Sequence, residues 1–340
     1  MEDIKNIILK RGKEESLMRF HPWVFSGAIY SCDFEPQEGE LVNVLSSKRE
    51  FIAKGHFQPS SIAVRVLTFD NEEIDLKWWK SRLSTAYGLR KAIGLTDNPQ
   101  TDCYRLVHGE GDGLPGLIVD IYSHTAVIQA HSAGIFNNLE IIAKCIVELY
   151  EGRIEAVYNK SDGTLPFKSG VDMSDGYIFG QKHDVNVIEN GNKFSVNWGH
   201  GQKTGFFIDQ RDNRELIRKY SKGRTVLNTF CYTGGFSVYA LRGGAEKVDS
   251  VDSSARAVEL ADLNVRMNFG ENASHEAIAA DAFDFIRRTE KTYDLIILDP
   301  PAFAKHHKVL GNALQGYKRL NANAMARINK EGILFTFSCS

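Results

Sequence analysis

The sequence predicts an α/β protein whose C-terminal part is a doubly wound parallel sheet. From residue 225 to residue 340, apolar runs typical of strands alternate with amphipathic helical patterns. This order builds a parallel sheet with helices on both faces. Ligands of such sheets bind at the carboxyl ends of the strands. The positions that follow the expected strands therefore form one candidate site: Gly234-Gly235, Asp252, Asp281, Asp299 and Cys339.

The stretch 225–254 predicts a nucleoside-binding unit. A strand at Val226-Leu227 leads through Thr233-Gly234-Gly235 into a helical pattern, and a second strand ends at Asp252. Glycine lets a ligand approach the backbone, and the acid accepts hydrogen bonds from ribose hydroxyls. The loop lacks the third glycine of a G-x-G-x-x-G fingerprint, which disfavours NAD and favours a nucleoside without phosphates, S-adenosylmethionine. The alternative is an ordinary turn with incidental glycines.

Composition limits the class of protein. The 340 residues predict two or three domains. There is no apolar run of the ~20 residues that a membrane span needs, and the charged N-terminus does not resemble a signal peptide. Five scattered cysteines without a C-x-x-C motif disfavour zinc and disulfides, so we expect a cytoplasmic protein without a metal site. From residue 191 onward, 21 Lys and Arg exceed 16 Asp and Glu, which is compatible with a polyanionic substrate.

Residues 1–72 predict a small all-β domain, because short β-rich runs alternate with turn residues. A basic cluster precedes the sequence His21-Pro22-Trp23-Val24-Phe25. Basic residues beside exposed aromatics contact RNA backbone and bases. For Trp23 and Phe25 we expect core positions, with contact to RNA as the alternative. The candidate RNA-binding residues are Lys10, Arg11, Lys13 and Arg19.

Residues 73–190 predict a mixed α/β middle domain in which we find no catalytic constellation. Its segment Gly109–Gly116 alternates acids with glycines. The acids suggest a metal site, but this alternation is also typical of turns. We therefore expect a hairpin turn between two strands.

The segment 201–214, GQKTGFFIDQRDNR, lies near the start of the third predicted domain, residues 191–340. Two aromatic residues precede a helix that we expect to begin at Asp209-Gln210. Such a place can cover an adenosyl group or hold an anion, which makes Phe206 and Asp209 candidate cofactor residues. The alternative is an ordinary entry helix.

Six motifs occur together in the second half of the chain: KTGFFIDQRDNR, NTFCYTGGFSVYA, SVDSS, DAFDF, LDPPAF and FSCS. As a set they resemble the large-subunit (23S) rRNA methyltransferase I family, Rossmann-like class I S-adenosylmethionine enzymes that form 5-methylcytosine. The resemblance covers essentially the whole chain. It implies that residues 1–72 are a PUA RNA-binding domain, that residues 73–190 are an insert, and that large-subunit rRNA is the partner.

The resemblance also implies a role for each residue of the site. Asp252 would contact the cofactor ribose, Asp281 the adenine, and the Gly234 loop the methionine end. Asp299 would lie beside the target base, and Cys339 would be the nucleophile. The candidate cofactor-binding residues are Phe206, Asp209, Thr233, Gly234, Gly235, Asp252, Asp281, Ala282 and Asp299.

The chemistry of cytosine agrees with a thiol at this edge. C5 is too weak a nucleophile to accept a methyl group unaided, and a thiolate that adds to C6 makes it reactive. Asp299, protonated or hydrogen-bonded at N3, would stabilise the adduct. The base must also be presented outside its stack.

Two features depart from the family pattern. No cysteine follows Asp299-Pro300-Pro301, and Cys231, in the cofactor turn, is expected to be a small apolar residue rather than a catalyst. Cys339 is the penultimate residue, so two strands of a seven-stranded sheet are missing. We expect a truncated chain with an exposed edge strand and impaired activity.

Two rival functions stay open. A methyltransferase that acts on a base nitrogen would use the loop Asp299–Phe303 to polarise an amine, and Cys339 would be structural. An inactive methyltransferase fold would be an RNA-binding protein. A dehydrogenase is disfavoured because the loop lacks the dinucleotide glycines. The target nucleotide and the oligomeric state are left open, with a homodimer among the alternatives.

Overall fold

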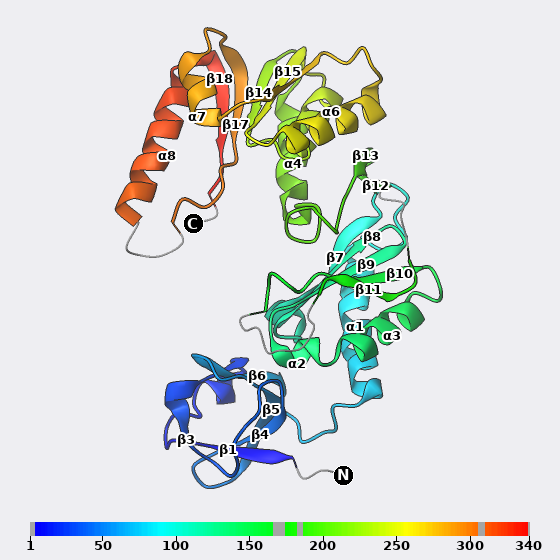
Figure 1. Ribbon diagram of the computed structural model, residues 1–340, viewed down its shortest axis with the longest axis vertical. Coiled ribbons are helices and arrows are strands. Elements are labelled where there is room, and N and C mark those ends of the chain that lie inside the picture. The colour runs from blue at the N-terminus through cyan, green and yellow to red at the C-terminus, as the bar shows by residue number, and fades with distance from the viewer. Residues whose placement is uncertain (1–3, 166–173, 182–185, 305–309, 339–340) are drawn as a thin grey trace. The chain divides into compact units, whose positions relative to one another are not determined.

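The computed structural model describes residues 4–165, 174–181, 186–304 and 310–338. The chain forms two compact units (Figure 1). The first contains Met1–Val185 and Asn197–Gly205, and the second contains Asn186–Val196 and Phe206–Ser340.

The first unit begins with a six-stranded sheet in the order β2-β6-β5-β4-β1-β3. Alternating apolar residues of its strands, such as Val42 and Val44, form a core of their own. This confirms the predicted N-terminal all-β domain. Its elements are β1 (Lys5–Leu9), η1 (Leu17–Arg19), β2 (Trp23–Phe25), η2 (Ser26–Ala28), β3 (Ile29–Cys32), β4 (Leu41–Leu45), β5 (Phe51–Phe57) and β6 (Ile62–Thr68).

The second part of this unit is a five-stranded mixed sheet in the order β11-β10-β9-β8-β7. Helices α1 and α3 lie side by side (Figure 1), and their apolar residues, including Trp79 and Ile142, share one core with the strands. The elements are α1 (Leu76–Ala92), β7 (Cys103–His108), η3 (Gly109–Asp112), β8 (Leu117–Tyr122), β9 (Thr125–Ala130), α2 (Ala133–Phe136), α3 (Leu139–Leu149), β10 (Ala156–Asn159) and β11 (Gly176–Phe179).

The glycine-rich segment after β7 is a connection between antiparallel strands, as predicted, because β7 pairs with β8. Its Asp112 carboxylate has partners within the protein. The Asp112 carboxylate accepts hydrogen bonds from the guanidinium of Arg90, with Nη2 at 2.8 Å from Oδ2. The backbone N–H of His108 donates to the same carboxylate at 2.6 Å.

The second unit contains the predicted parallel sheet, in the order β16-β15-β14-β17-β18. Every neighbouring pair is parallel, which confirms the predicted fold class. Its elements are β12 (Asn186–Glu189), β13 (Asn192–Ser195), η4 (Ile208–Gln210), α4 (Arg211–Tyr220), β14 (Thr225–Thr229), α5 (Gly235–Arg242), β15 (Lys247–Asp252), α6 (Ala255–Phe269), β16 (His275–Ala279), α7 (Ala282–Arg288), β17 (Tyr293–Leu298), α8 (Leu310–Met325) and β18 (Ile328–Thr336).

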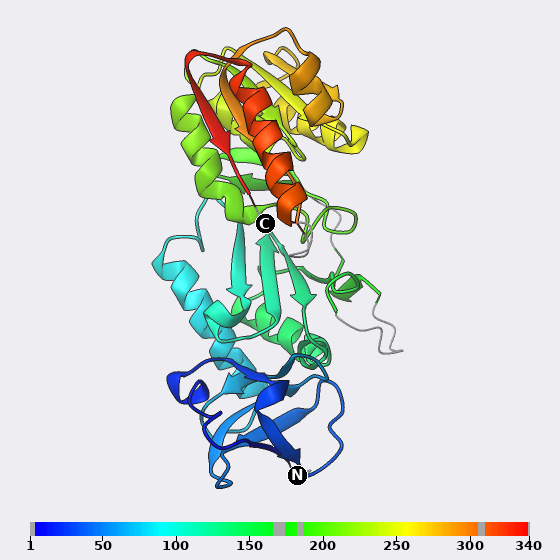
Figure 2. The same cartoon turned by 90° about the vertical axis from the view of Figure 1, so that its left-hand side faces the viewer.

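Helices cover both faces of this sheet. Ile217 of α4 and Ala240 of α5 share a core with one face of the strands, and Ile286 of α7 and Leu320 of α8 share a core with the other. In Figure 2 the red strand β18 runs between α4 and α8. Within the described residues, β18 pairs only with β17 and is an edge strand.

The chain crosses between the two units near the predicted boundary at residue 190. That boundary falls in the turn of the β12–β13 hairpin, which belongs to the second unit. The following segment, 197–205, returns to the first unit, where the Thr204 hydroxyl donates to Asp120 Oδ2 at 2.6 Å. The division into three domains at residues 72 and 190 stays a proposal. Within the described residues, we find no helix long and apolar enough to cross a membrane.

His56 of β5 is a buried imidazole, 5% exposed, that packs against helix α2. A Cβ added to Gly134 would lie 2.1 Å from His56 Cγ, so the ring rests directly on the helix backbone. Burial lowers the pKa of His56 from 6.5 to about 4.

We expect His56 to make the protein less stable in acid. The unfolded chain binds a proton at this imidazole near pH 6.5 and the folded chain only near pH 4, so stability is lost as the pH falls through that window. From neutral pH to about pH 4, the wild type should lose about 3 kcal/mol more unfolding free energy than His56→Leu. Urea titrations at the two pH values measure this difference, and equal losses in the two proteins would contradict it.

Candidate active site

The carboxyl ends of the parallel strands bring the predicted positions to one edge of the sheet. Thr229 at the end of β14 pairs with Val251 of β15 and with Leu298 of β17. β15 pairs in turn with β16 up to its last residue, Ala279. The candidates that follow these ends are Gly234 after β14, Asp252 at the end of β15, Asp281 after β16 and Asp299 after β17.

The loop after β14 has a strained backbone. Phe230 and Tyr232 have φ values of +56° and +46°, and Gly234 has +71°. Residues with a side chain rarely adopt this region, and such strain is concentrated at functional sites. A Cβ on Gly234 would lie 2.8 Å from Cβ of Ala261. The glycine therefore allows helix α6 to approach the loop.

Thr233 and Gly235 complete this loop. The Thr233 side chain is buried, and its carbonyl accepts a hydrogen bond from Asn264 Nδ2 of α6 at 2.8 Å. Gly235 is the first residue of α5. A Cβ there would lie 3.0 Å from Cδ of Arg214, so the loop also rests on helix α4.

The carboxylate of Asp252 ties the glycine loop to the end of β15. Oδ2 accepts from the Tyr232 N–H at 3.0 Å, and Oδ1 accepts from the Ser254 N–H at 2.9 Å. The residue is partly exposed. Since an ionised carboxylate has about four acceptor positions, Asp252 can accept further hydrogen bonds from a ligand on this edge.

Asp281 is the N-cap of α7, and its Oδ1 accepts from the Asp284 N–H at 2.9 Å. The Asp281 side chain is exposed at the sheet edge, whereas the neighbouring Ala282 is buried, at 3% exposed. A ligand at this edge would meet the carboxylate of Asp281 rather than the methyl group of Ala282.

The structure distinguishes the two aromatic residues before α4. Phe206, the predicted candidate, is 2% exposed. Its ring centroid lies 5.0 Å from that of Phe194 and 4.5 Å from the guanidinium carbon of Arg214. Phe207 is partly exposed and packs edge-on against Tyr232 of the glycine loop, at 5.4 Å between ring centroids. Phe206 therefore lies in the core, and its neighbour Phe207 borders the loop.

Asp209 and Asp299 differ in their surroundings. Asp209 is exposed in the 3₁₀ turn η4. Asp299 is partly exposed immediately after β17, and its Oδ2 accepts a hydrogen bond from Gln210 Nε2 at 3.5 Å. The sequence places Gln210 at the start of a helix and carries no signal for a contact with Asp299.

Of the two cysteines of the second unit, the structure describes Cys231. Cys231 is 5% exposed in the glycine loop. Burial, and then the charge of Asp252, raises the pKa of its thiol, which opposes formation of a thiolate. Cys339, the predicted nucleophile, lies outside the described residues.

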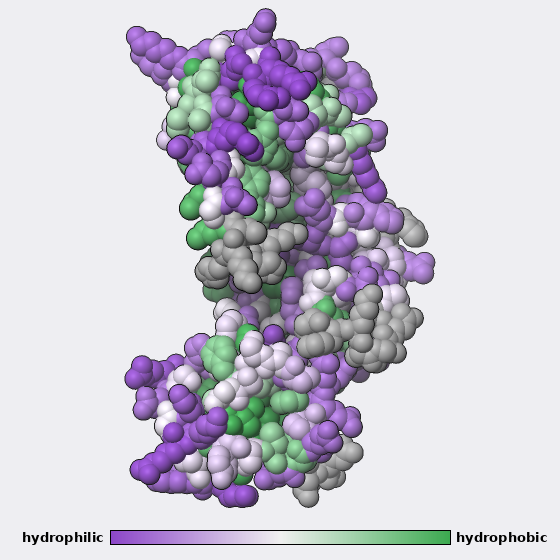
Figure 3. Space-filling model, turned by 60° about the vertical axis from the view of Figure 1, so that its left-hand side comes forward, coloured by the Kyte–Doolittle hydropathy of each residue, from purple (hydrophilic) through white to green (hydrophobic). Residues whose placement is uncertain are grey.

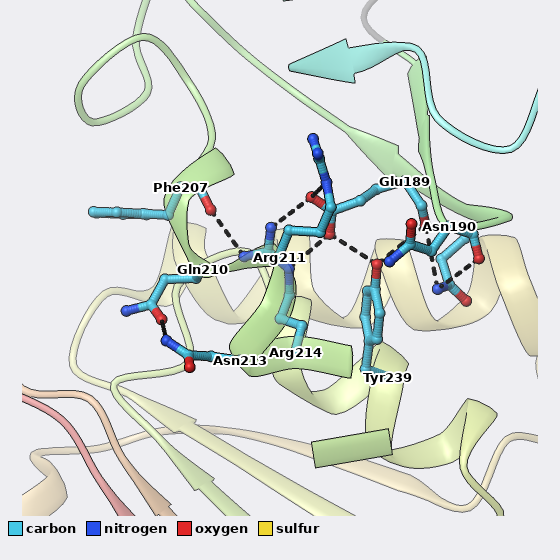
Figure 4. A network of polar contacts seen from close by, with 9 residues as sticks. Glu189, Asn190, Phe207, Gln210, Arg211, Asn213, Arg214 and Tyr239 are labelled. Carbon is cyan, nitrogen blue, oxygen red and sulfur yellow. Dashed lines mark hydrogen bonds and ion pairs between the residues drawn. The ribbon is translucent and has the colours of Figure 1, made fainter. Parts of the chain in front are cut away.

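A buried ion-pair network joins β12, α4 and α5 (Figure 4), and its Arg214 lies against Gly235 of the glycine loop. Glu189 of β12 is 0% exposed and accepts two hydrogen bonds from Arg214 of α4, Nε to Oε1 and Nη2 to Oε2, both at 2.7 Å. The hydroxyl of Tyr239 in α5 donates to Oε1 at 2.9 Å, and Arg211 Nε donates to Oε2 at 3.4 Å. The sequence carried no signal for this network, because Glu189 is one acid at the end of a short strand.

The candidate RNA-binding residues all lie at the surface of the β-domain, where hydrophobic side chains also reach the surface (lower part of Figure 3). Phe25 is 50% exposed, so the prediction that it is a core residue is wrong. Trp23 is partly exposed, and its Nε1 donates to Glu110 at 2.8 Å. A cavity of about 330 Å³ opens here, lined by Lys13, Ser16, Leu17, Trp23, Val24, Phe25, Gly27 and Ala28.

A parallel sheet of this strand order, with a glycine loop after its central strand and an acid at the end of the next, is typical of enzymes that bind a nucleoside cofactor. A family model for S-adenosylmethionine-dependent methyltransferases matches residues 138–336, and a model for PUA-like domains matches residues 7–69. The first match covers more than half of the chain. The chain therefore has an S-adenosylmethionine-dependent methyltransferase domain and an N-terminal PUA-like domain.

Similar proteins narrow the family. The ribosomal RNA large subunit methyltransferase I of Erwinia tasmaniensis is 39% identical over 98% of this chain and 85% of its own length. The protein of the same name from Escherichia coli O157:H7 is 38% identical over the same shares. The crystal structure of SMU.776 complexed with SAH matches with a TM-score of 0.81 at 25% identity, over 97% of this chain and 84% of that one. The chain belongs to the ribosomal RNA large subunit methyltransferase I family, and its cofactor is S-adenosyl-L-methionine.

Gly234 provides a test of the loop. We expect Gly234→Ala to be destabilised by the left-handed backbone, about 1–2 kcal/mol, and in addition by the contact with Ala261, about 1–3 kcal/mol. Gly223→Ala is the matched control, since Gly223 has φ +67° with no atom within 4 Å of an added Cβ. Urea unfolding compares them, and equal losses of stability would show that α6 does not press on the loop.

Proposed function

We propose that this protein transfers a methyl group from S-adenosylmethionine to C5 of a cytosine in 23S rRNA. One observation carries the proposal: Asp299 after β17 and the glycine loop after β14 lie on the same edge of the sheet, at neighbouring strands. Such an edge can hold a cofactor and a base beside one another. The names of the similar proteins supply the class of RNA.

The residues on this edge fit S-adenosylmethionine. The loop turns through a left-handed glycine, Gly234 at φ +71°, and Asp252 has acceptor positions left for the ribose hydroxyls. In this proposal, Asp281 accepts from the adenine amino group, and the loop from Thr233 to Gly235 holds the methionine end. Phe207 replaces Phe206 as the aromatic residue beside the cofactor.

The cofactor supplies a methyl group bound to a sulfonium, and the chain has to make C5 of the base reactive. The Cys339 thiolate adds to C6 of the cytosine, forming an S–C6 bond and an enamine-like ring whose C5 accepts the methyl group. Asp299 hydrogen-bonds at N3 and stabilises the charge that addition places on the ring. A base then removes the C5 proton, the S–C6 bond breaks, and the thiolate is released.

The surface of the β-domain supports the RNA part of the proposal. Partly exposed Trp23 and Phe25 line the cavity beside Lys13, and Lys10, Arg11 and Arg19 lie exposed on the same domain. Aromatic faces stack unpaired bases, and cations contact phosphates. We propose that the rRNA is held here while the methyltransferase domain acts on the target base.

The covalent step can be trapped. The protein, S-adenosylmethionine and a 23S rRNA fragment containing 5-fluorocytidine are combined and separated on a denaturing gel. Because fluorine at C5 cannot leave as a proton does, the adduct persists. We expect a covalent complex with the wild type and with the control variant Cys32→Ala, and none with Cys339→Ala.

The other outcomes identify the rival functions. Methyl transfer that persists undiminished in Cys339→Ala would overturn the thiol mechanism and support methylation of a base nitrogen by the loop of Asp299. Calorimetry with S-adenosylhomocysteine tests the third possibility. If the wild type fails to bind it, the fold serves RNA binding without catalysis.

A further inference from the structure

The side chain of Gln210 connects the start of helix α4 to the acid at the end of β17. Gln210 Nε2 donates a long hydrogen bond, 3.5 Å, to Asp299 Oδ2. The Gln210 side chain has a second, shorter hydrogen bond. Asn213 Nδ2, one helical turn further on, donates to Gln210 Oε1 at 2.6 Å. The amide oxygen of Gln210 is thus bound by Asn213, and its amino group faces Asp299.

This arrangement determines which amide atom meets the carboxylate. With Oε1 accepting from Asn213, the N–H₂ group of Gln210 is turned to Asp299. The reverse orientation would place the amide oxygen against a carboxylate oxygen and the two amino groups against each other, and both contacts are repulsive. The hydrogen bond limits rotation of the Asp299 carboxyl group about its own side chain.

The backbone that carries Gln210 is held by Arg214. Arg214 Nη1 donates to the carbonyl of Phe207 at 2.9 Å, and its Nε and Nη2 donate to the Glu189 carboxylate (Figure 4). Phe207 is the N-cap of the turn η4, of which Gln210 is the last residue. Arg214 therefore binds the N-cap residue of the turn through its backbone, and Asn213 binds the last residue, Gln210, through its side chain.

The pair of Glu189 and Arg214 is rigid because it is fully enclosed. The two side chains are 0% and 3% exposed, and planar bidentate pairs of this kind have strict geometry. The carboxylate is also bound by Tyr239 and Arg211. The same guanidinium lies against Gly235 of the cofactor loop, so one buried pair sets the position of both the loop and the turn.

We propose that Gln210 is a positioning residue that orients Asp299 towards the target base, and that the buried Glu189–Arg214 pair holds Gln210 in place. The inference rests on the proposed function, in which Asp299 contacts the base. It does not depend on which atom of the base is methylated, because Asp299 would have to be oriented for either reaction. Gln210 acts through Asp299 and is not a catalytic residue.

Three variants test this role in the full-length protein with rRNA fragments. Gln210→Glu keeps the size of the side chain but replaces the donor by an acceptor, and Gln210→Ala removes both. Asp212→Ala, at an exposed position of the same helix, is the matched control. We expect kcat for methyl transfer to fall about tenfold to hundredfold in both Gln210 variants. KM for RNA, Kd for S-adenosylhomocysteine and the unfolding temperature should stay at the wild-type values, as they should in Asp212→Ala.

A second arm tests the connection through the turn. Arg214→Lys retains the charge but cannot form the fork to Glu189 and the bond to Phe207 together. We expect Arg214→Lys to lower kcat, and the double variant with Gln210→Ala to be no slower than the slower single variant. Independent residues would instead give losses that multiply.

The results separate this role from the proposed function. Wild-type kcat in Gln210→Ala, or a loss that only follows a weaker Kd or a lower unfolding temperature, would overturn the positioning role. Methylation at a base nitrogen with a slow Gln210→Ala would overturn the C5 product and leave the role of Gln210 intact.

Discussion

The buried ion pair between Glu189 and Arg214 is the interaction on which the carboxyl edge of the parallel sheet depends. Placing two charges in the interior is costly, and removing one partner of such a pair costs about 3–5 kcal/mol because the other charge is left unpaired. Here the pair fastens the β12–β13 hairpin to α4, and through Tyr239 it also reaches α5. The hairpin ends at Ser195, well before the parallel sheet begins at Thr225, yet it supplies the acid that binds Arg214 of helix α4.

A second constraint comes from the parallel sheet itself. Because neighbouring parallel strands end at the same edge, four segments far apart in sequence deliver their end residues to one place. The glycine loop after β14 is the most constrained of them, with a left-handed Gly234 against Ala261 and a Gly235 against Arg214. Asp252 then fastens the loop through the Tyr232 N–H. Loop, acid and ion pair are therefore one connected structure, held by the Asp252 carboxylate on one side and by Arg214 on the other.

The sequence was sufficient for features that depend on local pattern. The strand ends before Asp252, Asp281 and Asp299 could be placed because apolar runs followed by an acid recur at each of them, and the parallel order follows from the strand–helix alternation. Contacts between residues far apart in the chain could not be predicted from the sequence. Glu189 becomes significant only when Arg214, 25 residues later, folds against it.

The choice between adjacent residues was also beyond the sequence. Phe206 and Phe207 are the same residue type, and only the direction of the turn before α4 places one in the core and the other beside Tyr232. Phe25 was expected inside because it is apolar, but it is half exposed on the short strand β2. At the edge of a small sheet, residue type alone does not decide burial.

The central claim is that the methyl group is transferred to C5 of a cytosine, and release of the C5 hydrogen tests it most directly. An rRNA fragment labelled with tritium at C5 of its cytidines is incubated with the protein and S-adenosylmethionine, and tritium in water is counted against methyl groups in RNA. C5 methylation replaces that hydrogen, so the account predicts one tritium released for each methyl group transferred. Methylated RNA that keeps all of its tritium would contradict it.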